Sequence, residues 1–154
     1  MLELTWVCKP FVELTPHELY AIIKLRNEVF VVEQNCVFQD ADDKDQVCYH
    51  LSGLTTNNKI AAYARLVPAG VSYSHISIGR VITSPDHRKE GFGKSLMTKA
   101  IEECDRLFGK QSIQIGAQLY LKEFYQAFGF KQISDMYLED DIPHIEMLLE
   151  PGFE

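Results

Sequence analysis

The spacing of apolar residues along this chain switches between a helical and a strand-like period. Apolar side chains recur every three or four residues from Leu19 to Phe30, and every three or four residues from Phe92 to Leu107, which predicts two amphipathic helices. Elsewhere, short apolar runs rich in β-branched residues are separated by polar turns, as is typical of strands. We expect strands over residues 4–7, 47–54, 60–68, 74–83, 112–117, 131–138 and 142–149, and a short helix over 121–128.

Local signals mark where several of these elements begin and end. The segment Thr15-Pro16-His17-Glu18 is a capping box with proline at the first helical position, so a helix begins there and runs to about Val31. Pro85 ends the strand over 74–83, and Gly109 ends the second long helix. Strand, helix and strand in this order indicate a right-handed βαβ unit with parallel strands. The sequence therefore predicts an α/β fold in which a mixed, mostly antiparallel central sheet has a parallel βαβ core and helices on both faces.

Length and charge limit the possible functions. The 154 residues suit one domain over 1–154, and no repeat or linker divides them. The net charge of −7 argues against nucleic-acid binding, which depends on basic surface. No apolar window could span a membrane, the N-terminus does not read as a secretory signal, and the four cysteines lack metal-ligand spacing. We expect a cytoplasmic monomer or homodimer that binds no metal, membrane or nucleic acid.

The segment from Ser77 to Leu96 is the strongest candidate for chemistry. It joins a β-rich run, a proline, a basic loop containing glycine and the start of an amphipathic helix. This order brings backbone N–H groups and the positive end of a helix together, with Arg88, Lys89 and Lys94 nearby. Such a place favours a ligand that carries phosphate.

The glycine spacing of this segment excludes two familiar phosphate loops. A P-loop would need glycine where Arg88 stands, and a dinucleotide fingerprint would need one at Leu96. The spacing that fits is Arg-x-x-Gly-x-Gly, given by Arg88, Gly91 and Gly93, whose glycines let the main chain lie close to a diphosphate. It resembles the acetyl-CoA pyrophosphate loop of the GCN5-related N-acetyltransferases, the GNAT superfamily. The alternative is a strand-to-helix turn that only needs glycines.

The resemblance extends over nearly the whole chain. The run Phe124-Tyr125-Gln126-Ala127-Phe128-Gly129-Phe130 is similar to a Phe-Tyr-x-x-x-Gly-Phe signature near the end of that superfamily. The runs from Leu25 to Gln34 and from Asp141 to Ile145 narrow the resemblance to the ElaA-like branch. Two positions depart from many relatives: Lys89 replaces a glycine, and Gln118 replaces an asparagine.

The resemblance implies an acetyl-CoA-dependent N-acetyltransferase that moves an acetyl group directly to a primary amine. Tyr125 matches the general acid of the superfamily, and its alternative role is core packing. A non-catalytic acyl-CoA-binding or sensing module is the second hypothesis, and a pyridoxal- or nucleotide-binding structural protein is a weaker third. The residues that the resemblance assigns to acetyl-CoA are Val81, Ile82, Thr83, Arg88, Lys89, Glu90, Gly91, Phe92, Gly93, Lys94, Gln118 and Tyr125.

Direct transfer also needs a base, because an ammonium group has no lone pair with which to attack. Glu33 is the first candidate, since it closes an apolar run at the end of the first helix; it could instead be a surface residue. His144 and His50 are alternatives that would act through water, or they could be structural. Arg65 and Arg80 could bind an acidic group of the acceptor, or pair with Glu33.

Two acidic runs complete the candidate chemistry. Asp40, Asp42, Asp43 and Asp45 form the first, and residues 139–141 form the second. Both could be solvated loops. Alternatively, their negative charge could raise the local concentration of cationic amines, which makes an amine the expected partner besides acetyl-CoA.

Overall fold

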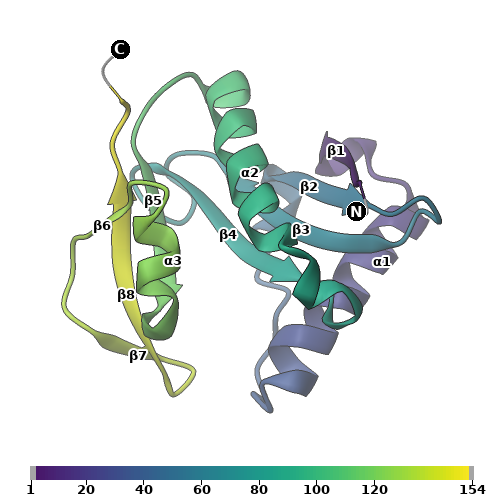
Figure 1. The fold of residues 1–154 in the computed structure, drawn as a ribbon, viewed down its shortest axis with the longest axis horizontal. Helices are drawn as coiled ribbons and strands as arrows, with labels where there is room; N and C mark the ends of the chain where they lie inside the picture. The colour runs from purple at the N-terminus through teal and green to yellow at the C-terminus, as the bar shows by residue number, and fades with distance from the viewer. Residues whose placement is uncertain (1–2, 153–154) are drawn as a thin grey trace.

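The computed structural model describes residues 3–152, which form a mixed sheet with helices on both faces (Figure 1). The strands are β1 (Thr5–Pro10), β2 (Tyr49–Leu54), β3 (Ile60–Val67), β4 (Ile76–Thr83), β5 (Ile113–Gln118), β6 (Lys131–Gln132), β7 (Tyr137–Glu139) and β8 (Ile142–Leu149). The helices are α1 (Pro16–Arg26), α2 (Phe92–Phe108), α3 (Lys122–Gln126) and the π-helix η2 (Asn27–Glu33). Short 3-10 turns are η1 (Phe11–Glu13), η3 (Asp45–Val47), η4 (Pro85–Glu90) and η5 (Leu119–Leu121).

The sheet order confirms the predicted fold class. The strands follow the order β1-β2-β3-β4-β5-β8-β6, and β7 pairs with the other end of β8. β4 and β5 are parallel and are joined through α2, whereas the remaining pairs are antiparallel. α1 and η2 lie on one face of the sheet, and α2 and α3 cover the other.

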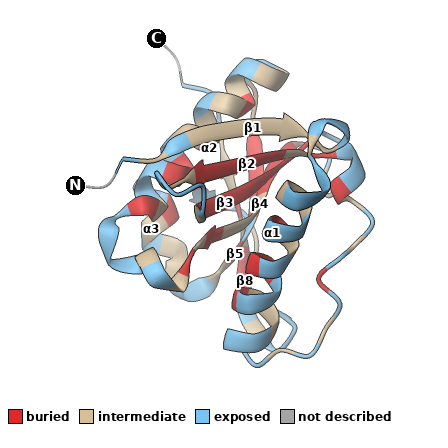
Figure 2. Cartoon of the chain, turned by 90° about the vertical axis from the view of Figure 1, so that its right-hand side faces the viewer, coloured by how far each residue is buried: buried red, intermediate tan, exposed pale blue. Residues whose placement is uncertain are grey.

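Each face of the sheet has its own apolar cluster. The larger cluster lies under α2, where Leu96 and Ala100 pack on the central strands, as their four-residue spacing predicts. The smaller cluster places Ile22 and Val29 against Tyr63 and neighbouring residues. Figure 2 shows the buried residues concentrated in the central strands. Burying one such aliphatic side chain contributes about 1.5–3 kcal/mol, so these contacts hold the helices on the sheet.

The first helix differs from the prediction in its second half. The capping box is present, because the Thr15 hydroxyl accepts from the Glu18 N–H while the Glu18 carboxylate accepts from the Thr15 N–H. The α-helix ends at Arg26, however, and continues as a π-helix to Glu33, two residues beyond the predicted end. A π-helix widens each turn by one residue and so changes which side chains share a face.

The prediction of one strand over residues 131–138 is wrong. The structure divides it into β6 and β7, which pair with opposite ends of β8. Between them, the Ser134 hydroxyl accepts the hydrogen bond of the Glu146 N–H, at 2.9 Å. A side chain thus replaces the backbone carbonyl that a continuous strand would supply, and the chain leaves the ladder there.

The centre of the sheet opens between β4 and β5. Only two residue pairs join these strands, Ile76 with Ile113 and Ser77 with Gln114. Beyond them β4 remains paired with β3, and β5 remains paired with β8. Against β3, Ala64 faces two residues of β4 where the register shifts, which is a β-bulge. Because bulges bend strands, this irregularity accounts for the divergence of β4 from β5.

Candidate active site

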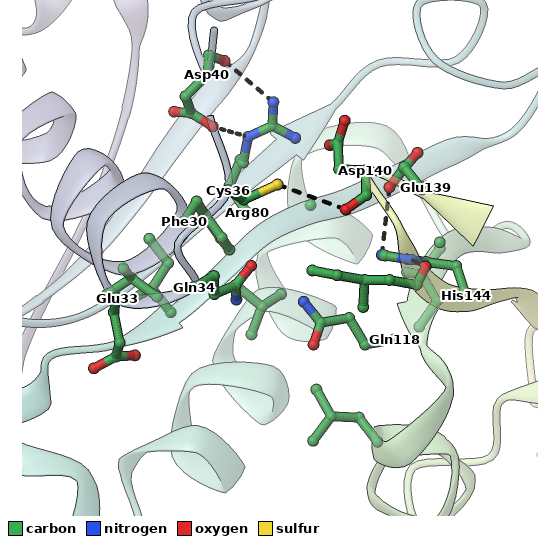
Figure 3. Close-up of a pocket in the computed structure, with 18 of the residues that line it drawn as sticks. Phe30, Glu33, Gln34, Cys36, Asp40, Arg80, Gln118, Glu139, Asp140 and His144 are labelled. Carbon is green, nitrogen blue, oxygen red and sulfur yellow. Dashed lines mark hydrogen bonds and ion pairs between the residues drawn. The ribbon is translucent and has the colours of Figure 1, made fainter. Parts of the chain in front are cut away.

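A cavity of about 820 Å³ occupies the gap between the diverging strands. β4 and the start of α2 form one wall, and β5, α3 and β8 form the other. η2 and the loop after it cover the cavity on one side, and the β7–β8 turn lies opposite (Figure 3). Segments from both halves of the sheet therefore contribute to one site.

The β4 wall presents backbone to the cavity. Val81, Ile82 and Thr83 line it, and within the described residues no strand pairs with the edge of β4 that faces the gap at these positions. Main-chain N–H and C=O groups along such an edge can pair with a ligand that lies in the gap. Gln118 reaches the cavity from the end of β5.

The segment predicted to bind phosphate lies beside this wall, and part of it is a helix where the sequence predicted a loop. Residues 85–90 form η4, and Gly91 at φ +76° turns the chain into α2 without a side-chain cap for its first N–H groups. Glycine suits Gly91 because other residues rarely adopt this left-handed conformation. The uncapped N–H groups are suited to an anion.

Only part of this segment reaches the cavity directly. Arg88 and Gly93 line it. Phe92 is buried in the core, which explains the large apolar residue between two glycines. The other residues that the resemblance assigned to acetyl-CoA here are exposed and are not part of the cavity wall: Lys89, Glu90, Gly91 and Lys94.

Arg88 is held by Glu33 across the mouth of the cavity. Its two terminal nitrogens lie 2.7 and 2.5 Å from the two carboxylate oxygens of Glu33. Hydrogen bonds from Arg88, and then its charge, lower the pKa of the Glu33 carboxyl. Arg88, which was predicted to bind phosphate, and Glu33, the predicted base, therefore form one ion pair.

Tyr125 lies inside the cavity wall on α3. The residue is 6% exposed, and its ring packs edge-on against Phe124 and Phe130. Burial, with a smaller contribution from Tyr120, raises the pKa of Tyr125 to about 12. The phenol is therefore protonated at neutral pH, and the residue both packs in the core and faces the cavity.

The first acidic run is neither a solvated loop nor a surface that attracts amines. Three of its four carboxylates pair with arginines from α1, β3 and β4 in a largely buried network, whereas Asp43 is exposed. Burial opposes the ionisation of Asp42, but hydrogen bonds and charge from Arg65 outweigh it and hold the pKa of that carboxyl well below its usual range. The network consists of Arg26, Arg65, Arg80, Asp40, Asp42 and Asp45.

This network also contains two arginines whose roles the sequence left open. Arg65 and Arg80 pair with the aspartates and not with Glu33. Arg80 lies at the bulge of β4 with φ +50°, which costs roughly 1–2 kcal/mol for a residue other than glycine. Asp40 accepts from Arg80 Nε at 2.8 Å, and the Phe30 ring lies 5.9 Å from the guanidinium carbon. These contacts hold the strained residue that shapes the cavity.

His50 is a structural residue, so its candidacy as a base is wrong. Its Nδ1 accepts from the Tyr63 hydroxyl at 2.7 Å, and its Nε2–H donates to the main-chain oxygen of Asp45 at 3.0 Å. Burial lowers its pKa, and the residue is not part of the cavity wall. Both ring nitrogens are occupied by partners in the core.

His144 lies in the cavity on β8, together with residues of the second acidic run. Its Nδ1 is 2.7 Å from the main-chain oxygen of Ile142, and its Nε2 is 3.4 Å from Oε2 of Glu139 (Figure 3). Tyr137 stacks on the ring. Glu139 was predicted only as part of an acidic run, and its contact with His144 depends on the pairing of β7 with β8.

Sequence reasoning missed Cys36 as a cavity residue. Its thiol donates to the main-chain oxygen of Asp140 at 3.6 Å and links the loop after η2 to the β7–β8 turn. The two residues are 104 positions apart, so no local signal identifies the contact. All four cysteines are free thiols, of which Cys48 and Cys104 are buried.

The whole fold is shared with known acyltransferases. Residues 23–151 match the family model described as "Acetyltransferase (GNAT) domain". The chain is 42% identical to protein ElaA of Escherichia coli over 140 residues, which cover 90% of this chain and 91% of that protein. It is also 44% identical to UPF0039 protein C11D3.02c of Schizosaccharomyces pombe over 151 residues, which cover 97% of this chain and 99% of that protein.

Solved structures agree with these relationships. An acyl-CoA N-acyltransferase from Pseudomonas aeruginosa superposes with a TM-score of 0.90 at 39% identity, covering 96% of this chain and 99% of that one. E. coli ElaA superposes with a TM-score of 0.89 at 40% identity and the same coverage. Among residues 3–152, no helix is long and apolar enough to cross a membrane, and no group of side chains has the arrangement of a metal site.

Proposed function

Because this chain belongs to the GNAT family of acetyltransferases, in its ElaA-like branch, we propose that it transfers an acetyl group directly from acetyl-CoA to a primary amine. Acyl transfer is the activity of the family. The acetyl group and the amine acceptor are the specific parts of the proposal. The observation that supports it most is that the open edge of β4, the N-terminus of α2 and Tyr125 all border one cavity.

The donor half of the site fits a CoA thioester. The uncapped start of α2 and the Arg88 guanidinium suit the diphosphate, and the open edge of β4 at Val81 to Thr83 suits the amide groups of the pantetheine arm. A backbone N–H of this edge can stabilise the charge that develops on the thioester oxygen. Gln118, at the far wall, is positioned to contact the same arm.

Tyr125 supplies the proton that the leaving sulfur needs. Its raised pKa keeps the phenol protonated at neutral pH, so it can donate to a thiolate as the carbon–sulfur bond breaks. Glu33 remains a candidate base, but its ion pair with Arg88 makes the carboxylate a weak proton acceptor. A phosphate group that draws Arg88 away would make Glu33 more basic.

A non-catalytic acyl-CoA sensor is the second candidate, and turnover separates it from the enzyme. First, thermal unfolding is measured with acetyl-CoA, CoA, ATP and NAD. A ligand at one hundred times its Kd stabilises the fold by about 2.7 kcal/mol, so acetyl-CoA and CoA should raise the Tm much more than ATP or NAD. Equal stabilisation by NAD would contradict the proposed site.

Second, release of free CoA thiol is followed with acetyl-CoA and a panel of primary amines, amino acids and peptides. Thiol release that depends on an amine, together with an acetylated product of the expected mass, supports the enzyme. Binding without turnover across the panel favours the sensor. Propionyl- and longer acyl-CoA in the same assay test whether acetyl is the preferred group.

A further inference from the structure

We propose that His144 accepts the proton of the acceptor ammonium and that Glu139 binds this ammonium beside it, so that the acceptors are amines that arrive as cations. This inference rests on the proposed acyl transfer. It names the general base of that reaction and the class of its acceptor. It replaces Glu33 as the main base, because the Glu33 side chain is 40% exposed at the mouth of the cavity, whereas His144 is 9% exposed in its other half.

The sheet fixes His144 in place. Its neighbours across the ladder are Gln118 on β5 and Tyr137 on β7, so the three residues form one row over three strands. Tyr137 stacks on the imidazole with ring centroids 6.0 Å apart. The His144 side chain is only 9% exposed, and the cavity is the open space beside it. A base held on strands in this way keeps its geometry during the reaction.

The hydrogen bonds of His144 determine which nitrogen can act. The main-chain oxygen of Ile142, 2.7 Å from Nδ1, can only accept, so Nδ1 carries a hydrogen. This assignment follows from the partners of the ring. In the neutral ring the lone pair is therefore on Nε2, the nitrogen near Glu139. Once Nε2 takes a proton, it can donate to that carboxylate.

The charges around His144 favour a cationic ligand. Glu139 and Tyr137 come from β7, Asp140 comes from the β7–β8 turn, and Cys36 lies across the cavity. The basic side chains of the cavity wall have partners of their own: Arg80 pairs with Asp40 and Asp42, Arg88 pairs with Glu33, and Lys44 Nζ donates to the Ser72 hydroxyl. Glu139 is 60% exposed, so its carboxylate can meet an amine that enters from solvent.

The proposed steps balance in protons and electrons. The ammonium gives one proton to Nε2 of His144 and becomes a neutral amine. Its lone pair forms the bond to the thioester carbon, the carbon–sulfur bond breaks, and the thiolate takes the phenol proton of Tyr125. The second proton that the nitrogen loses restores the phenol. The products are an amide, free CoA thiol and one proton, which His144 releases to solvent.

Two nucleophiles test this role, because only one of them needs a base. Butylamine is protonated at neutral pH, whereas hydroxylamine is not. His144→Asn keeps a hydrogen-bond donor near the position of Nδ1 and removes Nε2. Since general base catalysis is worth about 10²–10⁴ in rate, kcat for butylamine at neutral pH should fall at least about 100-fold, and the remaining activity should increase with pH as more of the amine loses its proton in solution. Acylation of hydroxylamine should change less than about threefold.

Matched variants separate the roles of the two residues. Glu139→Gln should mainly raise the KM for butylamine, while Asp135→Asn, an exposed acid outside the cavity, should not. His17→Asn on α1 is the control for His144. All variants should keep the wild-type Tm shift with acetyl-CoA.

If His144→Asn lowers the activity with butylamine and with hydroxylamine equally, His144 is a structural residue. That result would overturn this inference but leave the proposed function standing. Unchanged kinetics of His144→Asn with butylamine would also overturn this inference. If the wild-type protein acylates neither nucleophile although it binds acetyl-CoA, the proposed function itself fails.

Discussion

Arg88 and Glu33 form a two-point ion pair that joins η4 to the end of the π-helix, although they lie 55 residues apart. A diphosphate that binds Arg88 must compete with this carboxylate. Donor binding is therefore coupled to the charge at the entrance of the cavity.

Glu33→Gln should strengthen the binding of CoA, because it leaves Arg88 available to phosphate. An exposed ion pair is worth about 0.2–1 kcal/mol, so the Kd should fall by about 1.5- to 5-fold. Isothermal titration with CoA measures the change. Glu28→Gln, which removes an exposed charge from the same helix without a hydrogen bond to Arg88, should have a smaller effect. A weaker affinity in Glu33→Gln would mean that the carboxylate orients Arg88 for the ligand.

Tyr125→Phe should lower turnover at least about tenfold while the affinity for acetyl-CoA stays the same. The substitution keeps the packed ring and removes the proton donor. Steady-state kinetics and titration with acetyl-CoA measure the two quantities separately. Tyr20→Phe is the matched control, because that phenol is exposed on α1 and does not line the cavity. Full activity in Tyr125→Phe would leave solvent as the source of the proton.

Gly93→Val should abolish the Tm shift produced by acetyl-CoA without unfolding the protein. A Cβ at Gly93 would lie 3.8 Å from Phe124 and 3.9 Å from Thr83, which is ordinary van der Waals contact. The added methyl groups would occupy the cavity wall at the place proposed for the diphosphate. Gly152→Val, which meets no neighbour within 4 Å, is the control. A normal shift in Gly93→Val would argue against this route for the ligand.

Asp42→Asn and Asp43→Asn should have opposite outcomes although they are adjacent. Asp42 accepts two hydrogen bonds of 2.8 Å from Arg65, so its loss should lower the free energy of unfolding by about 1.5–3 kcal/mol. Asp43 is an exposed residue at φ +63°, a conformation that asparagine also tolerates, and its change should stay within about 0.5 kcal/mol. Urea unfolding measures both values. Equal stability of the two variants would contradict a structural role for the network.

Acid should destabilise the protein through the same network. The pKa values of Asp42 and Asp45 are lower in the fold than in the unfolded chain, so the unfolded chain binds more protons as pH falls below about 4. The stabilisation is complete above that range and is lost as pH falls through the folded pKa values. Urea midpoints between pH 5 and pH 3 should fall less steeply for Asp42→Asn than for the wild-type protein. Parallel slopes would show that other carboxylates dominate.

The sequence predicts best the features that depend on neighbouring residues. The capping box at Thr15 and the buried stripe of α2 follow from side chains within a few positions of each other. The break at Ser134 depends on its bond to Glu146, and the bulge at Arg80 depends on Asp40. No local pattern identifies such partners.

The site was predicted in part for the same reason. The motif spacing identified Arg88, Gly93 and Tyr125, which line the cavity. The acidic run from Asp40 was misread, because a sequence shows its charge but not the three arginines that neutralise it. Likewise, the role proposed for His144 depends on its contact with Glu139, which the pairing of β7 with β8 creates.

The divergence of β4 from β5 divides the sheet into two leaves, and each leaf is a continuous stretch of chain. Residues 5–83 contain β1 to β4, and residues 113–149 contain β5 to β8, with α2 between them. Glu33 belongs to the first stretch and Arg88 follows that stretch in η4, whereas Tyr125 and His144 belong to the last. Neither stretch carries all the residues that the proposed reaction uses. A chain cut between α2 and β5 would therefore yield two fragments that regain function only by reassembly.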